Sequence, residues 1–185
     1  MAVLTLANQL TLLRMLLIPA FVILIVYGEL GWALITFLVA GITDALDGLI
    51  ARWAGQKTTL GAWLDPMADK LLLISTFVVL TLPGIGLVSR IPLWLTVCLI
   101  SRDITIVLTV IVVNLAIGRR TFRPTLLGKV ATGVYILTGF VFLVVNYLGR
   151  PSPVTDVMVL LSLIITIISA LHYIRHAGRI ISDGA

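Results

Sequence analysis

Four aspartates in the first half of the chain stand where acidic residues are costly. Asp44 and Asp47 interrupt an apolar run long enough to cross a membrane, and Asp65 and Asp69 follow at the start of the next apolar run. Together they are half of the eight acidic residues in the chain. Ionisable residues inside the apolar segments of membrane proteins usually mark a functional site. These four carboxylates are therefore the first candidates for chemistry.

The spacing of the four aspartates predicts one shared pocket. Asp44 and Asp47 are three residues apart and Asp65 and Asp69 are four apart, so each pair shares one face of a helix. If the two helices are antiparallel neighbours, all four carboxylates converge and need a strong counter-charge to stay ionised. Oxygen ligands suit Mg²⁺, Mn²⁺ or Ca²⁺ rather than Zn²⁺ or Cu²⁺. Four acids are enough to hold two such ions, an arrangement that clamps a phosphoryl group during in-line displacement.

The composition shows what kind of molecule must position these acids. Of the 185 residues, 60% are hydrophobic and 11% are charged, whereas a soluble domain would have about 45–50% and about 25%. The mean hydropathy is +1.18. We therefore expect an all-α integral membrane protein that forms a single domain over residues 1–185. The net charge of +5 comes without a basic stripe and interleaved aromatic residues, so no nucleic-acid partner is expected.

Glycine and proline divide the chain into apolar segments of about the 20 residues that a membrane-spanning helix needs. We expect six transmembrane helices in one bundle. Pro19 predicts a kink in the first segment, or a short interfacial helix before the true span. The expected segments are residues 8–27, 31–53, 61–82, 92–117, 125–148 and 153–176.

The distribution of basic residues predicts the orientation, because cytoplasmic segments carry an excess of Lys and Arg. With six spans, both termini fall on the more basic side, which we interpret as cytoplasmic. The acidic pocket then opens towards the cytoplasm, and the cytoplasmic membrane of a prokaryote is the expected location. The basic side collects Arg14, Arg52, Lys57, Arg119, Arg120, Arg123, Lys129, Arg175 and Arg179, and the other side only Arg90 and Arg150.

Small residues accompany the acids at fixed spacing. Gly48, Ala51 and Gly61 leave space for a backbone or a ligand, and Arg52 can hold a phosphate or extend to the membrane surface. The full pattern reads Asp44-x2-Asp47-Gly48-x2-Ala51-Arg52-x8-Gly61-x3-Asp65-x3-Asp69. It resembles the signature of the CDP-alcohol phosphotransferases, with every signature position filled. The six-span layout is similar too, so the resemblance covers nearly the whole chain.

The resemblance implies an activity and a role for each signature residue. Such enzymes transfer a substituted phosphate from a CDP-linked donor, here CDP-diacylglycerol, to an alcohol and release CMP. Two divalent cations, Mg²⁺ or Mn²⁺, hold the diphosphate, and the enzymes are usually homodimers. By position, Asp44, Asp47, Asp65 and Asp69 would bind metal, and Asp69 would also be the general base. Asp47, Gly48, Ala51, Arg52 and Gly61 would line the donor site.

Other segments bear on the acceptor alcohol. Residues 8–14 and 64–72 resemble the phosphatidylglycerophosphate synthase branch, whose acceptor is glycerol 3-phosphate. Residues 101–103, Ser-Arg-Asp, and residues 123–132, which lack a second Lys, are closer to cardiolipin synthases of this superfamily, whose acceptor is phosphatidylglycerol. A phosphate-bearing glycerol acceptor is common to both. Its candidate ligands are Arg102, Asp103, Arg123 and Lys129.

Two alternatives stay open at this point. Acids inside a membrane also mark ion pathways, so a divalent-cation transporter is the competing class. Arg102 and Asp103 could also be purely structural partners of each other. Adjacent residues point about 100° apart on a helix, however, and this geometry argues against their pairing.

Overall fold

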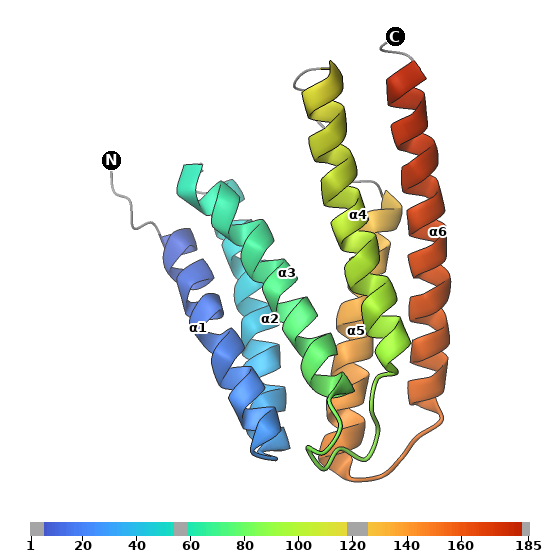
Figure 1. The fold of residues 1–185 in the computed structure, drawn as a ribbon. Helices are drawn as coiled ribbons and strands as arrows, with labels where there is room; N and C mark the ends of the chain where they lie inside the picture. Colours follow the sequence, from blue (N-terminus) through green and yellow to red (C-terminus); the bar gives the residue numbers. More distant parts are fainter. Residues whose placement is uncertain (1–5, 54–58, 118–125, 183–185) are drawn as a thin grey trace. The chain divides into compact units, whose positions relative to one another are not determined.

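The computed structural model describes the backbone of residues 6–53, 59–117 and 126–182, and the side chains of residues 9–44, 46, 67–109, 111, 115 and 126–175. Over these ranges the chain is all-helical, with six helices (Figure 1). They are α1 (Leu6–Val26), α2 (Leu30–Trp53), α3 (Thr59–Thr81), α4 (Leu93–Ile117), α5 (Leu126–Leu148) and α6 (Val154–Ser182).

The helices begin and end within two residues of the predicted bounds, with one exception. α6 continues to Ser182, six residues beyond the expected end of the span. α1 runs without a break through Pro19, so the prediction of a separate interfacial helix before the span is wrong. Proline is tolerated in apolar helices of this kind because neighbouring groups satisfy the freed carbonyl.

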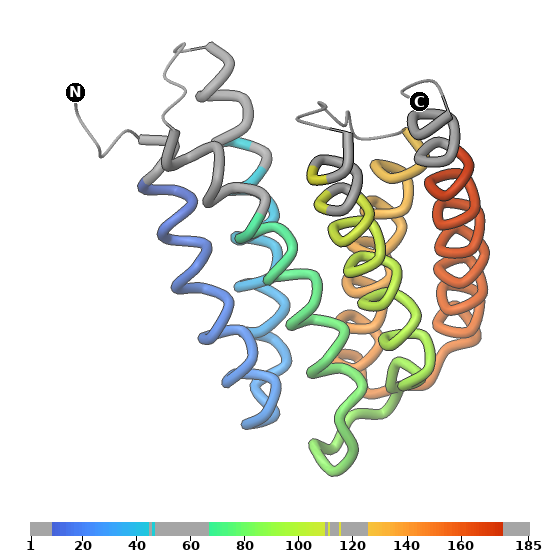
Figure 2. Tube along the Cα trace, turned by 45° about the horizontal axis from the view of Figure 1, so that its top comes forward, coloured from blue at the N-terminus to red at the C-terminus, as the bar shows by residue number. Residues whose placement is uncertain are grey.

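The helices group into two compact units. The first unit comprises Met1–Arg90 and Phe142–Pro151, and it contains α1, α2, α3 and the last turns of α5. Within it, α1 packs against both α2 and α3, as Figures 1 and 2 show. The turn from α1 to α2 is short because Gly28, with φ of 80°, adopts the left-handed conformation. This lets the N–H of Glu29 donate to the carbonyl of Leu24 at 2.8 Å, which closes the C-terminus of α1.

A side chain from α5 fixes the loop between α3 and α4 within the first unit. The Asn146 Oδ1 accepts from the Ser89 N–H at 3.0 Å, and the Asn146 Nδ2 donates to the Ser89 carbonyl at 2.8 Å. The same Nδ2 also donates to the Phe142 carbonyl at 2.7 Å. Asn146 is buried. It therefore supplies the loop backbone with the hydrogen bonds that a neighbouring strand would otherwise provide.

The second unit comprises Ile91–Val141 and Ser152–Ala185, and it contains α4, most of α5 and α6. α4 packs against α6. Hydrogen bonds from Arg102 to Ser169 and from Tyr173 to Ile106 connect these helices, and each joins residues 67 positions apart. A constant separation means that α4 and α6 run in the same direction, with α5 returning between them in the chain.

Three of the described helices are long and apolar enough to cross a bilayer, judged by length and composition. Their spanning stretches are Gln9–Val26, Leu126–Leu148 and Val154–Arg175. Within the described side chains of α2 the apolar stretch is Leu30–Asp44.

Candidate active site

α1 and α2 present matching buried stripes to each other. In α1 the stripe consists of Thr11, Arg14, Ile18, Phe21 and Ile25, at alternating spacings of three and four residues. In α2 the buried positions 33, 37 and 40 continue the same spacing and lead to position 44. Such spacing is the seam of two helices packed along their length. Both helices therefore place one charged residue in line with an apolar seam.

An aromatic contact sets the register of this seam. The rings of Phe21 and Phe37 lie with their centroids 5.9 Å apart. Arg14 lies seven residues before Phe21 in α1, and Asp44 lies seven residues after Phe37 in α2. The Arg14 Nη1 and the Asp44 Oδ1 form an ion pair at this layer. The antiparallel register that packs the two aromatic rings thus also brings the guanidinium to the first aspartate.

The two partners of this ion pair differ in their exposure. The Arg14 side chain is 0% exposed, whereas the Asp44 side chain is 42% exposed. The guanidinium thus approaches Asp44 from the interior of the first unit, and another side of the carboxylate is open. A carboxylate has acceptor positions on both oxygens. Asp44 can therefore hold a second cationic partner on its open side.

The other signature residues are only partly within the described structure. Asp69 lies on α3 and is partly exposed, between the buried Ala68 and the exposed Lys70. The side chains of Asp47, Gly48, Ala51, Arg52, Gly61 and Asp65 lie outside the described residues. Among the side chains that are described, no three metal-ligating groups come together. Convergence of the four carboxylates stays a prediction.

The described donors fit a hard divalent cation in their chemistry. Asp44 and Asp69 offer carboxylate oxygens, and both side chains are partly exposed. Mg²⁺ and Mn²⁺ prefer oxygen ligands and keep several waters, so they suit carboxylates that are partly exposed to solvent. Asp44 and Asp69 are therefore suitable as two members of a larger ligand set.

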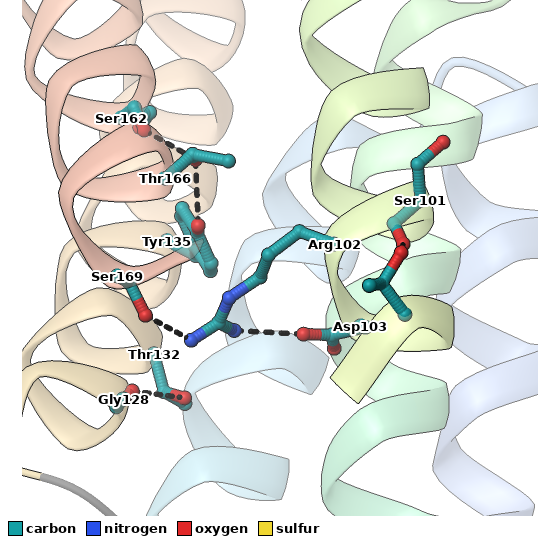
Figure 3. Close-up of polar contacts among 10 residues, drawn as sticks. Ser101, Arg102, Asp103, Gly128, Thr132, Tyr135, Ser162, Thr166 and Ser169 are labelled. Carbon is teal, nitrogen blue, oxygen red and sulfur yellow. Dashed lines mark hydrogen bonds and ion pairs between the residues drawn. The ribbon is translucent and has the colours of Figure 1, made fainter. Parts of the chain in front are cut away.

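A second cluster of charge lies in the second unit, around Arg102 on α4 (Figure 3). The Arg102 Nη1 donates to the Asp103 Oδ1 at 2.7 Å, and the Nη2 donates to the Ser169 Oγ of α6 at 2.5 Å. Both charged residues are buried. The expectation that adjacent residues would not pair is wrong here. The long arginine side chain lets its guanidinium reach back to Asp103, even though the two Cα–Cβ bonds diverge.

One donor of the Arg102 guanidinium, the Nε, has no partner among the described residues. This nitrogen is also buried. A buried donor without a partner costs about 1–3 kcal/mol, so such groups usually have a role or an additional partner. Lys129 on α5, another predicted acceptor ligand, is exposed, and Arg123 lies outside the described residues.

Sequence reasoning missed a chain of hydroxyl groups beside Arg102. Tyr135 on α5 and Thr166 on α6 share a hydrogen bond at 2.6 Å (Figure 3). Thr138 on α5 and Ser162 on α6 share another at 2.8 Å. The sequence of α6 contains a pattern that could have predicted these hydroxyl groups. Its buried positions Thr155, Ser162, Thr166 and Ser169 all carry hydroxyl groups at helical spacing in an otherwise apolar helix. Small hydroxyl residues are typical of helix interfaces in membranes.

Several known proteins are similar in sequence to this chain. A probable phosphatidylglycerophosphate synthase of Mycobacterium tuberculosis (strain H37Rv) is 35% identical over 191 residues, which cover 94% of this chain and 82% of that protein. The human cardiolipin synthase (CMP-forming) is 36% identical over 149 residues, 72% of this chain and 48% of that protein. The cardiolipin synthase (CMP-forming) of Streptomyces coelicolor is 39% identical over 140 residues, 70% of this chain and 60% of that protein.

The family model for CDP-alcohol phosphatidyltransferase matches residues 4–168. This range includes every residue of the acidic signature, and also Arg102 and Asp103. Together with the relatives it supports an enzyme over the alternative of a cation transporter. The chain belongs to the CDP-alcohol phosphatidyltransferase family.

Proposed function

We propose that this enzyme transfers the phosphatidyl group of CDP-diacylglycerol to glycerol 3-phosphate, with release of CMP and formation of phosphatidylglycerophosphate. We choose glycerol 3-phosphate as the acceptor because of how much of this chain one relative matches. The relative named phosphatidylglycerophosphate synthase matches 94% of this chain and 82% of its own length. The relatives named cardiolipin synthase match 70–72% of this chain.

The acidic signature supplies the donor site in this proposal. Asp44, Asp47, Asp65 and Asp69 would hold two divalent cations, Mg²⁺ or Mn²⁺. When bound, these cations neutralise the charge of the diphosphate and align it for displacement. The small residues Gly48, Ala51 and Gly61 would leave space for the cytidine and diphosphate, and Arg52 would pair with a phosphate oxygen.

Asp69 has the second role of general base. Its carboxylate accepts the proton of the attacking glycerol hydroxyl. The hydroxyl oxygen then forms a bond to the phosphorus that carries diacylglycerol, and the bond from this phosphorus to the bridging oxygen breaks. CMP leaves with that oxygen. The partial exposure of Asp69 supports this role, because a base must be accessible to a substrate from solution.

Arg102 is our choice for the phosphate of the acceptor. Two of its nitrogens are held by Asp103 and Ser169, while the buried Nε still has a hydrogen to donate. A guanidinium held on one side is pre-organised for an anion on the other. Asp103 would act as the partner that orients Arg102. Lys129 and Arg123 would add positive charge near the same phosphate.

Cardiolipin synthesis from phosphatidylglycerol is the second candidate. The Ser101-Arg102-Asp103 segment and the relatives named cardiolipin synthase favour it. Both acceptors present a glycerol hydroxyl and a phosphate, so the same residues could serve either one.

The proposal extends to topology and assembly. We place six membrane spans in the cytoplasmic membrane of a prokaryote, with both termini and the active site on the cytoplasmic side. The excess of basic residues on that side supports this orientation. We further propose a homodimer, which rests on the resemblance to the family.

An acceptor panel tests the proposed reaction. Purified enzyme with CDP-diacylglycerol and Mn²⁺ or Mg²⁺ is offered glycerol 3-phosphate, phosphatidylglycerol, inositol phosphate or serine in turn, and CMP release is measured. We expect release with glycerol 3-phosphate. If CMP is released with phosphatidylglycerol and not with glycerol 3-phosphate, the second candidate is established. If neither compound supports CMP release, both candidates are contradicted.

The role of Asp69 is tested by Asp69→Asn, with Asp156→Asn as the matched control. Asp156 is an exposed acid in the first turn of α6, so its substitution should leave CMP release unchanged. We expect Asp69→Asn to reduce release about 100-fold or more, while the protein stays folded and membrane-inserted. Full activity of Asp69→Asn would rule out its role as base.

A further inference from the structure

Arg14 stands out in the described structure because it is charged, wholly buried and outside the acidic signature. Its side chain is 0% exposed, and it forms the ion pair with Asp44. We propose that Arg14 is a positioning residue that holds the carboxylate of Asp44 for metal binding. This inference rests on the proposed function, in which Asp44 is a metal ligand.

The geometry favours positioning over competition with a metal. Arg14 reaches Asp44 through the seam between α1 and α2, in the layer two turns from the Phe21–Phe37 contact. The ion pair uses Oδ1, and 42% of the Asp44 side chain is exposed. A cation from solution would approach on the exposed side. The buried guanidinium and the cation can therefore bind the same carboxylate at once.

Packing alone does not require a charge at this position. The neighbouring layers of the α1 seam use Ile18, Phe21 and Ile25, all buried. An apolar residue in place of a buried ion pair is often neutral or stabilising. Arg14 thus places a desolvated charge in a seam whose next three layers along α1 are apolar. A role towards Asp44 explains that charge.

A residue that orients a metal ligand has a measurable effect on metal affinity. Loss of such a partner typically weakens metal binding or activity about 10–100-fold. A cation that only competed with the metal would have the opposite effect, since its removal would strengthen binding by relieving repulsion. A residue that served only to join α1 and α2 would leave the affinity unchanged. The sign of the change therefore separates the three roles.

The experiment measures Mn²⁺ binding to detergent-purified protein without donor or acceptor, using the electron paramagnetic resonance signal of free Mn²⁺. The variants are Arg14→Gln and Arg14→Lys, with Arg90→Gln as the matched control, because Arg90 is exposed. We expect Arg14→Gln to weaken Mn²⁺ binding about 10–100-fold. Arg14→Lys keeps the charge without the planar fork, so its affinity should fall between those of Arg14→Gln and the parent. Arg90→Gln should bind like the parent.

Unchanged or tighter Mn²⁺ binding by Arg14→Gln would overturn the inference. If Arg14→Gln does not yield folded protein, Arg14→Lys decides, and an affinity equal to the parent's would overturn it. Failure of the proposed function has a different signature. In that case the parent itself would bind no Mn²⁺ or release no CMP, whatever residue stands at position 14.

Discussion

The role assigned to Arg102 makes a quantitative prediction about the acceptor. Arg102→Gln replaces the guanidinium, whose buried Nε is unused within the described residues, by a neutral amide, and so removes the charge-assisted hydrogen bond to the acceptor phosphate. A hydrogen bond to a charged group contributes about 1.5–3 kcal/mol. Since each 1.4 kcal/mol is a factor of ten, we expect KM for glycerol 3-phosphate to rise about 10- to 150-fold. KM for CDP-diacylglycerol should change less than about threefold, because its proposed ligands are other residues.

The same substitution also lowers the stability of the protein, and the assay must separate this effect from the loss of affinity for the acceptor. Arg102 donates to Asp103 at 2.7 Å and to Ser169 at 2.5 Å, so Arg102→Gln leaves Asp103 buried without its guanidinium. Loss of one partner of a buried pair destabilises a protein by about 3–5 kcal/mol. The double variant Arg102→Gln/Asp103→Asn also removes the negative charge of Asp103. It should regain stability without regaining affinity for the acceptor.

The measurement is the initial rate of CMP release with each substrate varied in turn, alongside thermal unfolding in detergent. Arg150→Gln is the matched control, because Arg150 lies exposed in a loop. It should leave both KM values and the unfolding midpoint unchanged. If Arg102→Gln lowers the midpoint while KM for glycerol 3-phosphate stays within about twofold, Arg102 is structural and our reasoning about the acceptor is refuted.

Two further predictions concern the fold around the site. Asn146→Ala should lower the free energy of unfolding by about 1–3 kcal/mol, because it removes the hydrogen bonds to the Ser89 backbone. Ser89→Ala should have no effect, since the backbone of Ser89 makes these contacts, and equal unfolding midpoints for the two variants would contradict the assignment. Tyr135→Phe removes the hydroxyl bonded to Thr166 at 2.6 Å and should cost about 0.5–1.5 kcal/mol. An unchanged midpoint would show that this bond adds nothing to stability.

The sequence predicts the helices well because their ends are chemically marked. Gly28, Pro83, Pro92 and Pro153 fall between apolar runs, and each observed helix end adjacent to them lies within two residues of its predicted position. The end of α6 has no such mark. Hydropathy locates the edge of the apolar stretch near His176, but the backbone continues as a helix to Ser182. Apolar length therefore underestimates the length of this helix, which continues beyond the apolar stretch.

The partners of the charged residues were harder to predict than their positions. The sequence places Arg14 among the basic residues of the predicted cytoplasmic side and does not predict that it is buried and paired with Asp44. The available signal was its position in the buried stripe of α1, three residues after Thr11 and four before Ile18. Sequence spacing identifies which residues of a helix lie on the same face. It does not show which helix will cover that face.

The pairing of Arg102 with Asp103 shows where helical geometry stops being sufficient. The 100° between adjacent residues fixes the directions in which their side chains leave the backbone. An arginine has enough rotatable bonds for its guanidinium to depart from that direction, and a buried guanidinium has a strong reason to do so because it must find an acceptor. Ser169 provides a second acceptor from α6. The position of the charge is therefore decided by the acceptors that surround it, of which Asp103 is the next residue and Ser169 lies 67 residues away in the chain. For long charged side chains in apolar helices, the inventory of buried acceptors on neighbouring helices is the better guide to their partners.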